Sequence, residues 1–193
     1  MSILDHHLKQ SLVKGYISEK EESKLELLPE FLTNDAASNQ KVLTTIIKEL
    51  QNCEEFWFSV AFITTSGVAT LINTLIELKK RNIKGRIVAS KYLNFTQPLA
   101  LERLLENFSN IELRIAEHGD FHAKGYLFRK GETYNMIIGS SNMTSAALSK
   151  NKEWNLKISA QKESYIMRNA LGEFVKEFNK ATPVTKQWLL LIV

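Results

Sequence analysis

Three short segments of the sequence carry side chains suited to phosphate chemistry. His122 and Lys124 stand two residues apart in a stretch with strand character, so both side chains are predicted to project from one face. A Gly-Ser-Ser-Asn turn follows, just before a short helical segment, and its hydroxyl, amide and backbone N–H groups suit phosphate oxygens. The side chains predicted at the reaction centre are His122, Lys124, Ser140, Asn142 and Glu153, with Gly139 and Ser141 as further substrate contacts.

These residue types can together cleave a phosphodiester. Cleavage needs a nucleophile, donors for the charge on the non-bridging oxygens, and a proton for the leaving oxygen. A neutral His122 imidazole can attack phosphorus to form a phosphohistidine, while Lys124 and Asn142 hold the oxygens and a second histidine protonates the leaving group. Glu153 would orient the His122 ring and stabilise its cationic form. The alternative is that His-x-Lys lies on a solvated strand face and that Gly-Ser-Ser-Asn is only a turn.

The order and spacing of these residues resemble the signature of the phospholipase D superfamily, which has His-x-Lys, then Gly-Ser-x-Asn on the next strand, then an acidic residue. The resemblance covers most of residues 40–180. It is closest to bacterial nucleases with one motif per chain, and to related domains in metal-independent restriction endonucleases and at the N-terminus of some helicases. Arg129 departs from the full motif, which has Asp there. Because that branch also tends to lack this Asp, the departure bears more on the subfamily than on activity.

The number of histidines in the motif has a consequence for assembly. The chemistry requires two histidines, whereas the chain holds one His-x-Lys motif, so a twofold homodimer is expected to bring two copies of His122 to one phosphate. His118 is a weaker candidate for the pocket mouth, and His6 and His7 lie near the N-terminus. No cofactor and no metal are predicted, because no His, Asp or Glu cluster has ligand spacing and no ATP-binding glycine loop is present.

The periodicity of apolar residues predicts elements that position this site. Helices are expected at 39–51, 68–81 with Ser66 as cap, 98–106, 143–148 and 164–179. Strands are expected at 56–62, 85–89, 111–116, 121–128, 134–139 and 153–159, with a tight turn at 129–132. The alternation predicts an α/β layered domain with helices packed on a largely parallel sheet. The resemblance implies more closely an α/β phospholipase-D-like layered sandwich, with a mostly parallel or mixed central sheet and helices on both faces. The predicted division is an N-terminal arm or helix at 1–38, the phospholipase-D-like domain at 39–182, and a C-terminal segment at 183–193 that could begin a truncated downstream region.

The charge of the chain favours a polyanionic partner. Its formal net charge is +4 at neutral pH. The excess is concentrated between residues 79 and 91, where Lys84, Arg86 and Lys91 are predicted to contact nucleic acid, DNA above all. The alternative is that the first cations of this stretch only stabilise the end of a helix.

Three functions are compatible with this site. The first is a metal-independent nuclease in the cytoplasm, in keeping with a single cysteine and no membrane-binding segment. The second is a non-catalytic module that binds nucleic acid for a helicase or restriction system, with the helicase region in the same full-length protein. The third is a phospholipase or phosphatidyltransferase, which would be expected to carry an apolar interfacial patch.

Overall fold

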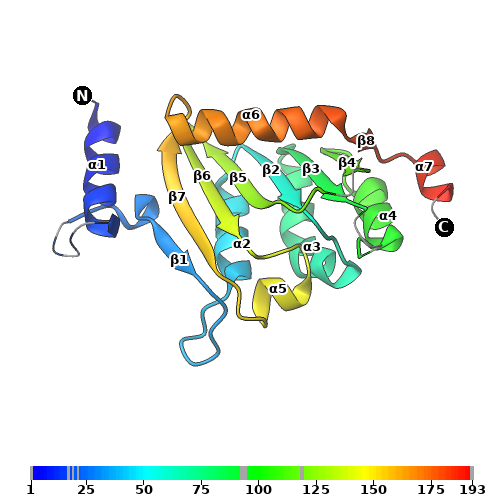
Figure 1. Cartoon of the computed structure of the whole chain (residues 1–193), viewed down its shortest axis with the longest axis horizontal. Coiled ribbons are helices and arrows are strands. Elements are labelled where there is room, and N and C mark those ends of the chain that lie inside the picture. The colour runs from blue at the N-terminus through cyan, green and yellow to red at the C-terminus, as the bar shows by residue number, and fades with distance from the viewer. Residues whose placement is uncertain are drawn as a thin grey trace.

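The computed structural model describes residues 2–16, 18, 20, 22–91, 95–117 and 120–191. Within this part of the chain an eight-stranded sheet runs in the order β1-β7-β6-β5-β2-β3-β4-β8 (Figure 1). The strands are β1 (Glu30–Leu32), β2 (Glu55–Val60), β3 (Lys84–Ser90), β4 (Ile111–Ala116), β5 (Lys124–Lys130), β6 (Thr133–Gly139), β7 (Asn155–Gln161) and β8 (Thr182–Pro183). The helices are α1 (Ile3–Tyr16), a 3-10 turn at Leu25–Leu27, α2 (Val42–Asn52), α3 (Thr65–Lys80), α4 (Pro98–Asn107), α5 (Ser145–Ser149), α6 (Tyr165–Lys180) and α7 (Lys186–Leu190).

The sheet is mixed, and its two halves follow from two kinds of connection. Strands β2, β3 and β4 are parallel, because α3 and α4 cross over between them. Strands β5, β6 and β7 pair antiparallel, and β5 joins the parallel half through an antiparallel pairing with β2. Gly131, with φ of 58°, makes the tight turn between β5 and β6. The α/β class is confirmed, while parallel pairing is confined to β2–β4 and does not extend through most of the sheet.

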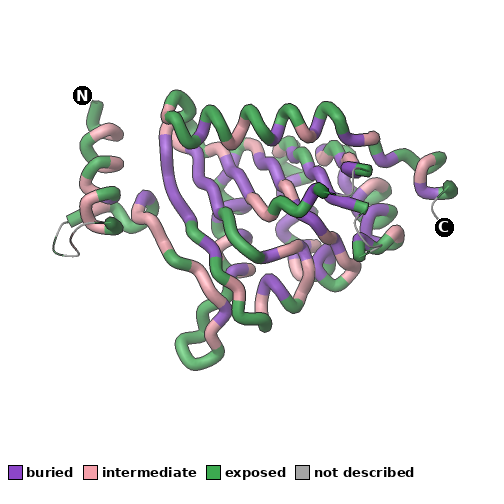
Figure 2. Tube along the Cα trace, viewed as in Figure 1, coloured by how far each residue is buried: buried purple, intermediate pink, exposed green. Residues whose placement is uncertain are grey.

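Helices cover both faces of the sheet, as the sequence predicted. Helices α2, α3, α4, α5 and α7 bury one face, where Phe56, Phe58 and Tyr126 are among the largest enclosed side chains. Helix α6 crosses the other face and packs Met167 and Phe174 on strand residues (Figures 1 and 2). Figure 2 shows the strands as the most buried part of the chain. The strands therefore form a rigid frame that positions the loops and side chains at their ends.

The predicted helices correspond to α2 through α6, with small shifts at their ends. The largest correction concerns the cap of α3, which was expected at Ser66. The cap is Thr64, whose Oγ1 accepts a hydrogen bond of 3.1 Å from the backbone N–H of Gly67, so the helix begins at Thr65. Both residues are good capping types, and the choice between them depends on where the chain leaves β2.

Segments outside residues 39–182 also contribute to the fold. Strand β1 pairs antiparallel with β7, and the Asn34 side chain accepts from the backbone N–H of Val42 at 2.9 Å. Strand β8 pairs with β4, and Leu189 of α7 joins the core. The division at residues 39 and 182 stays a prediction, although the sheet itself extends beyond both positions. In the described residues, no helix is both long and apolar enough to span a bilayer.

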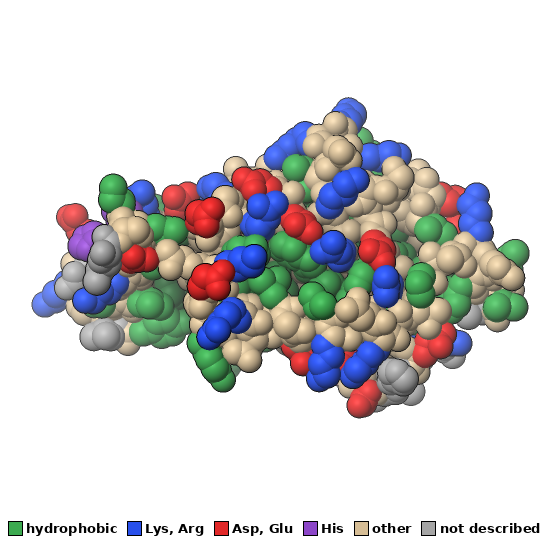
Figure 3. All heavy atoms as spheres, turned by 90° about the horizontal axis from the view of Figure 1, so that it is seen from above, with side chains coloured by type: hydrophobic (Ala, Val, Ile, Leu, Met, Phe, Trp, Pro, Cys, Tyr) green, Lys and Arg blue, Asp and Glu red, His purple; other side chains and the backbone are tan. Residues whose placement is uncertain are grey.

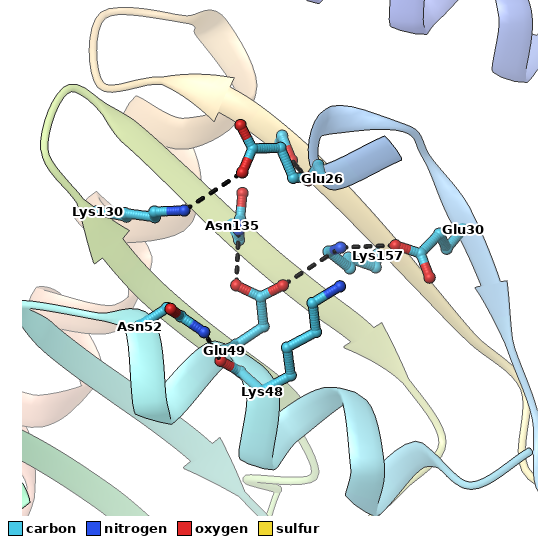
Figure 4. Close-up of polar contacts among 9 residues, drawn as sticks. Glu26, Glu30, Lys48, Glu49, Asn52, Lys130, Asn135 and Lys157 are labelled. Atoms are coloured by element: carbon cyan, nitrogen blue, oxygen red, sulfur yellow. Dashed lines mark hydrogen bonds and ion pairs between the residues drawn. The ribbon is translucent and has the colours of Figure 1, made fainter. Parts of the chain in front are cut away.

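A buried ion-pair cluster ties β1 and β7 to α2 (Figure 4). Lys157 is 1% exposed, and its Nζ lies 2.6 Å from Glu30 Oε1 and 3.2 Å from Glu49 Oε1. The other carboxylate oxygen of Glu49 accepts a 2.6 Å hydrogen bond from Asn135 Nδ2. Desolvation alone would lower the pKa of Lys157, but the two carboxylates outweigh it and raise the pKa. This cluster, Lys157, Glu30, Glu49 and Asn135, therefore holds a charged lysine inside the fold.

Candidate active site

Residues far apart in the sequence meet at one edge of the sheet. Val60 at the end of β2 lies opposite Lys124 at the start of β5, and Gly139 at the end of β6 lies opposite Asn155 at the start of β7. Because neighbouring strands are antiparallel here, strand ends and strand starts alternate along the same edge. The segments that reach this edge are those containing His122, residues 139–142 and Glu153.

His122 and Lys124 are in contact, although the strand begins later than expected. Strand β5 starts at Lys124, so His122 lies in the preceding loop and the shared strand face is not what brings them together. Lys124 Nζ lies 2.7 Å from Nδ1 and 3.2 Å from Nε2 of His122, and it donates to the His122 carbonyl at 2.8 Å. A charged ammonium at Nδ1 requires that nitrogen to accept, which in a neutral ring leaves the proton on Nε2. The Phe62 ring meets the imidazole edge-on at 5.7 Å between centroids.

The ammonium of Lys124 is placed where an anion would stabilise it. Partial burial lowers the pKa of Lys124, and the nearby carboxylate of Glu153 opposes this shift. A phosphate group entering the site would supply a further negative charge and favour the ammonium form. This is the electrostatic behaviour expected of a phosphate-binding lysine.

Glu153 and Ser140 are linked through a short network. The Ser140 hydroxyl donates to the Glu153 carboxylate and accepts from the Trp154 backbone N–H at 3.1 Å. The Ser140 backbone N–H donates in turn to the Trp154 carbonyl at 3.1 Å. Ser140 thus joins the turn after β6 to the segment before β7. A direct role of Ser140 on phosphate, and of Glu153 on His122, stays a prediction.

Asn142 and its neighbours attach the turn after β6 to the end of β2. The Asn142 side-chain oxygen accepts from the Phe62 backbone N–H at 3.1 Å, so the amide NH₂ is the end suited to a phosphate oxygen. Met143 bonds through its backbone to Phe62 and Thr64. Gly67 of α3 packs so closely on Met143 that an added Cβ would lie 1.9 Å from its carbonyl oxygen. Only glycine allows α3 this close to the turn.

Ser141 does not face the substrate, which corrects the prediction made for it. It is fully buried, its Oγ accepts from Asn155 Nδ2 at 2.9 Å, and its carbonyl accepts from the Tyr126 hydroxyl at 2.9 Å. Burial raises the pKa of Tyr126, which keeps that hydroxyl a donor. Sequence reasoning missed Tyr126 and Asn155, whose strand positions signal burial but not this contact. Gly139 is exposed beside them, and an added Cβ there would lie 2.2 Å from the Trp154 carbonyl oxygen.

Comparison with known proteins identifies the family. The family model described as "Cardiolipin synthase, PLD-like domain" matches residues 46–181. This chain belongs to the phospholipase D-like family. No curated protein sequence matches the chain.

Solved structures share the phospholipase D-like fold at low sequence identity. NucT from Helicobacter pylori superposes with a TM-score of 0.63 and 15% identity, covering 81% of this chain and 98% of its own. Nuc from Salmonella typhimurium, described as a phospholipase D family member, has a TM-score of 0.62 and 18% identity, and the superposition covers 82% of this chain and 99% of Nuc. A yeast tyrosyl-DNA phosphodiesterase has a TM-score of 0.52 and 10% identity, and the superposition covers 78% of this chain and 38% of the yeast chain. These likenesses establish the fold.

Two of the predicted basic contacts lie away from the phospholipase D-like site. Lys84 and Arg86 are at the start of β3, whereas the site is at the end of the neighbouring β2, and a seven-residue strand is about 20 Å long. Arg86 is paired with Glu55 at 3.1 Å. Lys91 follows the end of β3 and so lies at the same edge as the site. The direction of β3 therefore places Lys84 and Arg86 at the opposite edge of the sheet from the site, and their contact with nucleic acid stays a prediction.

Arg129 also lies at the far edge of the sheet. It is near the end of β5 and forms ion pairs with Glu54 at 3.0 Å and Glu55 at 3.8 Å. The position that carries Asp in the full motif is therefore one strand length from His122 in this fold. His118 lies outside the described residues. Among the described residues, no group of three or more His, Cys, Asp or Glu could hold a metal ion.

A broad groove connects the site to α6. It has a volume of about 1430 Å³ and is lined by His122, Lys124, Gly139 and, across from them, Asn169 and Lys180 of α6. Figure 3 shows basic and acidic side chains mixed over the face that carries α6, with apolar surface between them. The groove is large enough for a polymer backbone, but its lining includes Glu173 and Glu177 beside Lys180 and so is not uniformly basic.

Replacing Glu153 with glutamine is expected to lower turnover on the order of 10²-fold if its carboxylate orients the His122 ring, because the charge that stabilises the imidazolium is lost. Glutamine keeps an acceptor for the Ser140 hydroxyl, so stability should change little. The measurement is kcat and kcat/KM of the wild type and the variant at neutral pH. An unchanged rate would restrict Glu153 to its contact with Ser140.

Proposed function

We propose that this phospholipase D-like domain hydrolyses phosphodiester bonds in nucleic acid, DNA above all, without a divalent metal. The observation that carries the proposal is the contact of the Lys124 ammonium with the His122 ring. The turn after β6 and the segment containing Glu153 lie at the same edge of the sheet. Binding a phosphate requires only cations and donors, whereas a histidine held against a lysine also supplies a nucleophile.

The proposed reaction has two steps. When the phosphate enters, the Lys124 ammonium and the Asn142 amide bind its non-bridging oxygens, and an unprotonated nitrogen of His122 attacks phosphorus. The N–P bond forms as the P–O bond to the leaving group breaks, and the leaving oxygen takes a proton from a second histidine. Water then attacks the phosphohistidine, the second histidine accepts its proton, and His122 is released.

The second histidine is proposed to come from a second copy of the chain. The sequence contains four histidines, and His6 and His7 belong to α1, which stands at the side of the fold (Figure 1). A twofold homodimer with its axis at the site would place two His122 side chains on opposite sides of one phosphate. The cytoplasmic location and a helicase or restriction region in the full-length protein stay predictions of the sequence.

Nucleic acid is the proposed substrate class because of charge and shape. The chain carries a net charge of +4, Lys91 is at the edge with the site, and the groove along α6 is long and open. The yeast enzyme that shares the fold acts on DNA by its name. A phospholipid is the competing phosphodiester, since the family description names cardiolipin synthase.

Cleavage of labelled single- and double-stranded DNA is expected to proceed at the same rate in EDTA as in Mg²⁺, because the proposed charge stabilisation comes from Lys124 and Asn142. The same protein should leave phospholipid vesicles intact. Activity that appears only with Mg²⁺ or Mn²⁺ would refute the histidine mechanism. Tight DNA binding without cleavage in either buffer would favour the non-catalytic module.

A further inference from the structure

Exposed aromatic side chains flank His122 on both sides along the edge of the sheet. On the side of β7, Trp154 is 71% exposed and Phe31 is 59% exposed, with ring centroids 5.4 Å apart and planes at 77°. On the side of β2, Phe95 is 53% exposed and packs on Phe62 at 5.0 Å. Phe62 in turn contacts the His122 ring. Single exposed aromatic side chains are common, but neighbouring ones that form a contiguous apolar surface mark an interaction site more often.

The first pair is held rigidly to the site. Trp154 directly follows Glu153, and both its backbone N–H and its carbonyl are bonded to Ser140. Phe31 lies opposite Leu156 in the pairing of β1 with β7, so it projects beside Trp154 on the same face. Leu156 is itself 37% exposed, and Ile138 on the neighbouring strand is 50% exposed. Phe31, Trp154, Ile138 and Leu156 thus form a small apolar surface next to the predicted phosphate site.

The order of the strands sets the separation of the two aromatic pairs. From β2 to β7 the sheet passes through β5 and β6, which at about 4.8 Å per strand gives roughly 14 Å. The His122 and Lys124 side chains lie between the two pairs. A nucleic-acid strand that follows the edge would thus present a phosphate to His122 and one base to each aromatic pair.

We propose that Trp154 with Phe31, and Phe95 with Phe62, are base-stacking platforms on either side of the scissile phosphate, which makes single-stranded nucleic acid the preferred substrate. The proposal rests on the proposed function in that it takes nucleic acid as the ligand. Aromatic faces bind bases of any identity by stacking. In a duplex those base faces are already stacked on one another, so pairing must be disrupted before the platforms can be used.

The test compares binding of a short single-stranded DNA, its duplex, and the same strand with abasic sites, all with His122→Ala as the parent protein so that bound DNA is not cleaved. Trp154→Ala and Phe95→Ala are each expected to weaken binding of the intact single strand about 5- to 150-fold, the range for loss of one stacked base. Binding of the abasic strand should change little, and Trp154→Phe should recover most of the affinity. Tyr16→Ala is the matched control, because Tyr16 is 57% exposed on α1 and does not line the groove.

Several other outcomes would overturn the stacking proposal. Equal losses on intact and abasic strands, or an equal loss with Tyr16→Ala, would show that the effect is not stacking at these positions. A wild-type dimer that Trp154→Ala converts to a monomer would assign the apolar surface to a second copy of the chain. Because binding is measured in the His122→Ala parent and cleavage in the wild type, the two proposals can fail separately. Base stacking through Trp154 with no cleavage by the wild type would refute only the nuclease proposal. Cleavage by the wild type, with binding unaltered by Trp154→Ala and Phe95→Ala, would refute only the platforms.

Discussion

Cleavage by a His122→Ala variant is expected to fall by roughly 10³-fold or more, because the variant lacks the nucleophile and cannot form the phosphohistidine. The measurement is the single-turnover rate on labelled DNA in EDTA. His122 is exposed, so the free energy of unfolding should stay within about 0.5 kcal/mol of wild type. His6→Ala, an exposed histidine on α1, is the matched control and should retain full activity. Persistent cleavage in His122→Ala would exclude this residue as the nucleophile.

Mixed dimers separate the shared site from two independent sites. If one phosphate uses His122 from both copies, heterodimers of wild-type and His122→Ala chains should be nearly inactive, because every composite site lacks one histidine. Differently tagged chains can be co-expressed and the heterodimer purified through both tags. A heterodimer with about half the wild-type rate, or a strictly monomeric protein that cleaves, would contradict the shared site.

A Lys157→Met variant is expected to lose about 3–5 kcal/mol of stability, the range for breaking a buried ion pair. Methionine fills much of the space of the lysine stem, but it leaves the buried Glu49 carboxylate without its cation. For a domain of this size the melting temperature should fall on the order of 10 °C. Urea unfolding at neutral pH measures the effect, and an unchanged midpoint would mean that the ion pair contributes nothing net.

The charge partners of Lys157 provide the control for this prediction. In a Lys157→Met, Glu49→Gln double variant no buried carboxylate is left unpaired, so much of the loss should be recovered. The pKa of Lys157 is raised above its ordinary value of 10.5 in the folded protein. The stabilisation is therefore fully present below that ordinary value and is lost only as alkaline pH passes the raised pKa. Wild type and Lys157→Met should converge in stability at strongly alkaline pH if the protein remains folded there.

Much of the architecture could be predicted from local patterns. Apolar spacing placed α2, α4 and α6 to within a few residues, and β4 was predicted with its observed bounds. Predictions about single residues at the ends of elements were less accurate. Ser66 was expected to cap α3 where Thr64 does, and His122 was expected within a strand that begins at Lys124. Caps and strand ends depend on contacts with distant segments, which a local pattern does not contain.

The sequence by itself determined the α/β class, the chemistry available to His122 and Lys124, and the resemblance to the phospholipase D-like family, because residue type and spacing are local properties. Only the tertiary structure decided which of the predicted contacts share one edge of the sheet. It placed Lys91 with the site, Lys84 and Arg86 at the far end, and Ser141 in the core. It also brought Phe31 beside Trp154, more than a hundred residues later. Pairing of β1 with β7 brings those two side chains together, and strand pairing depends on the whole sheet.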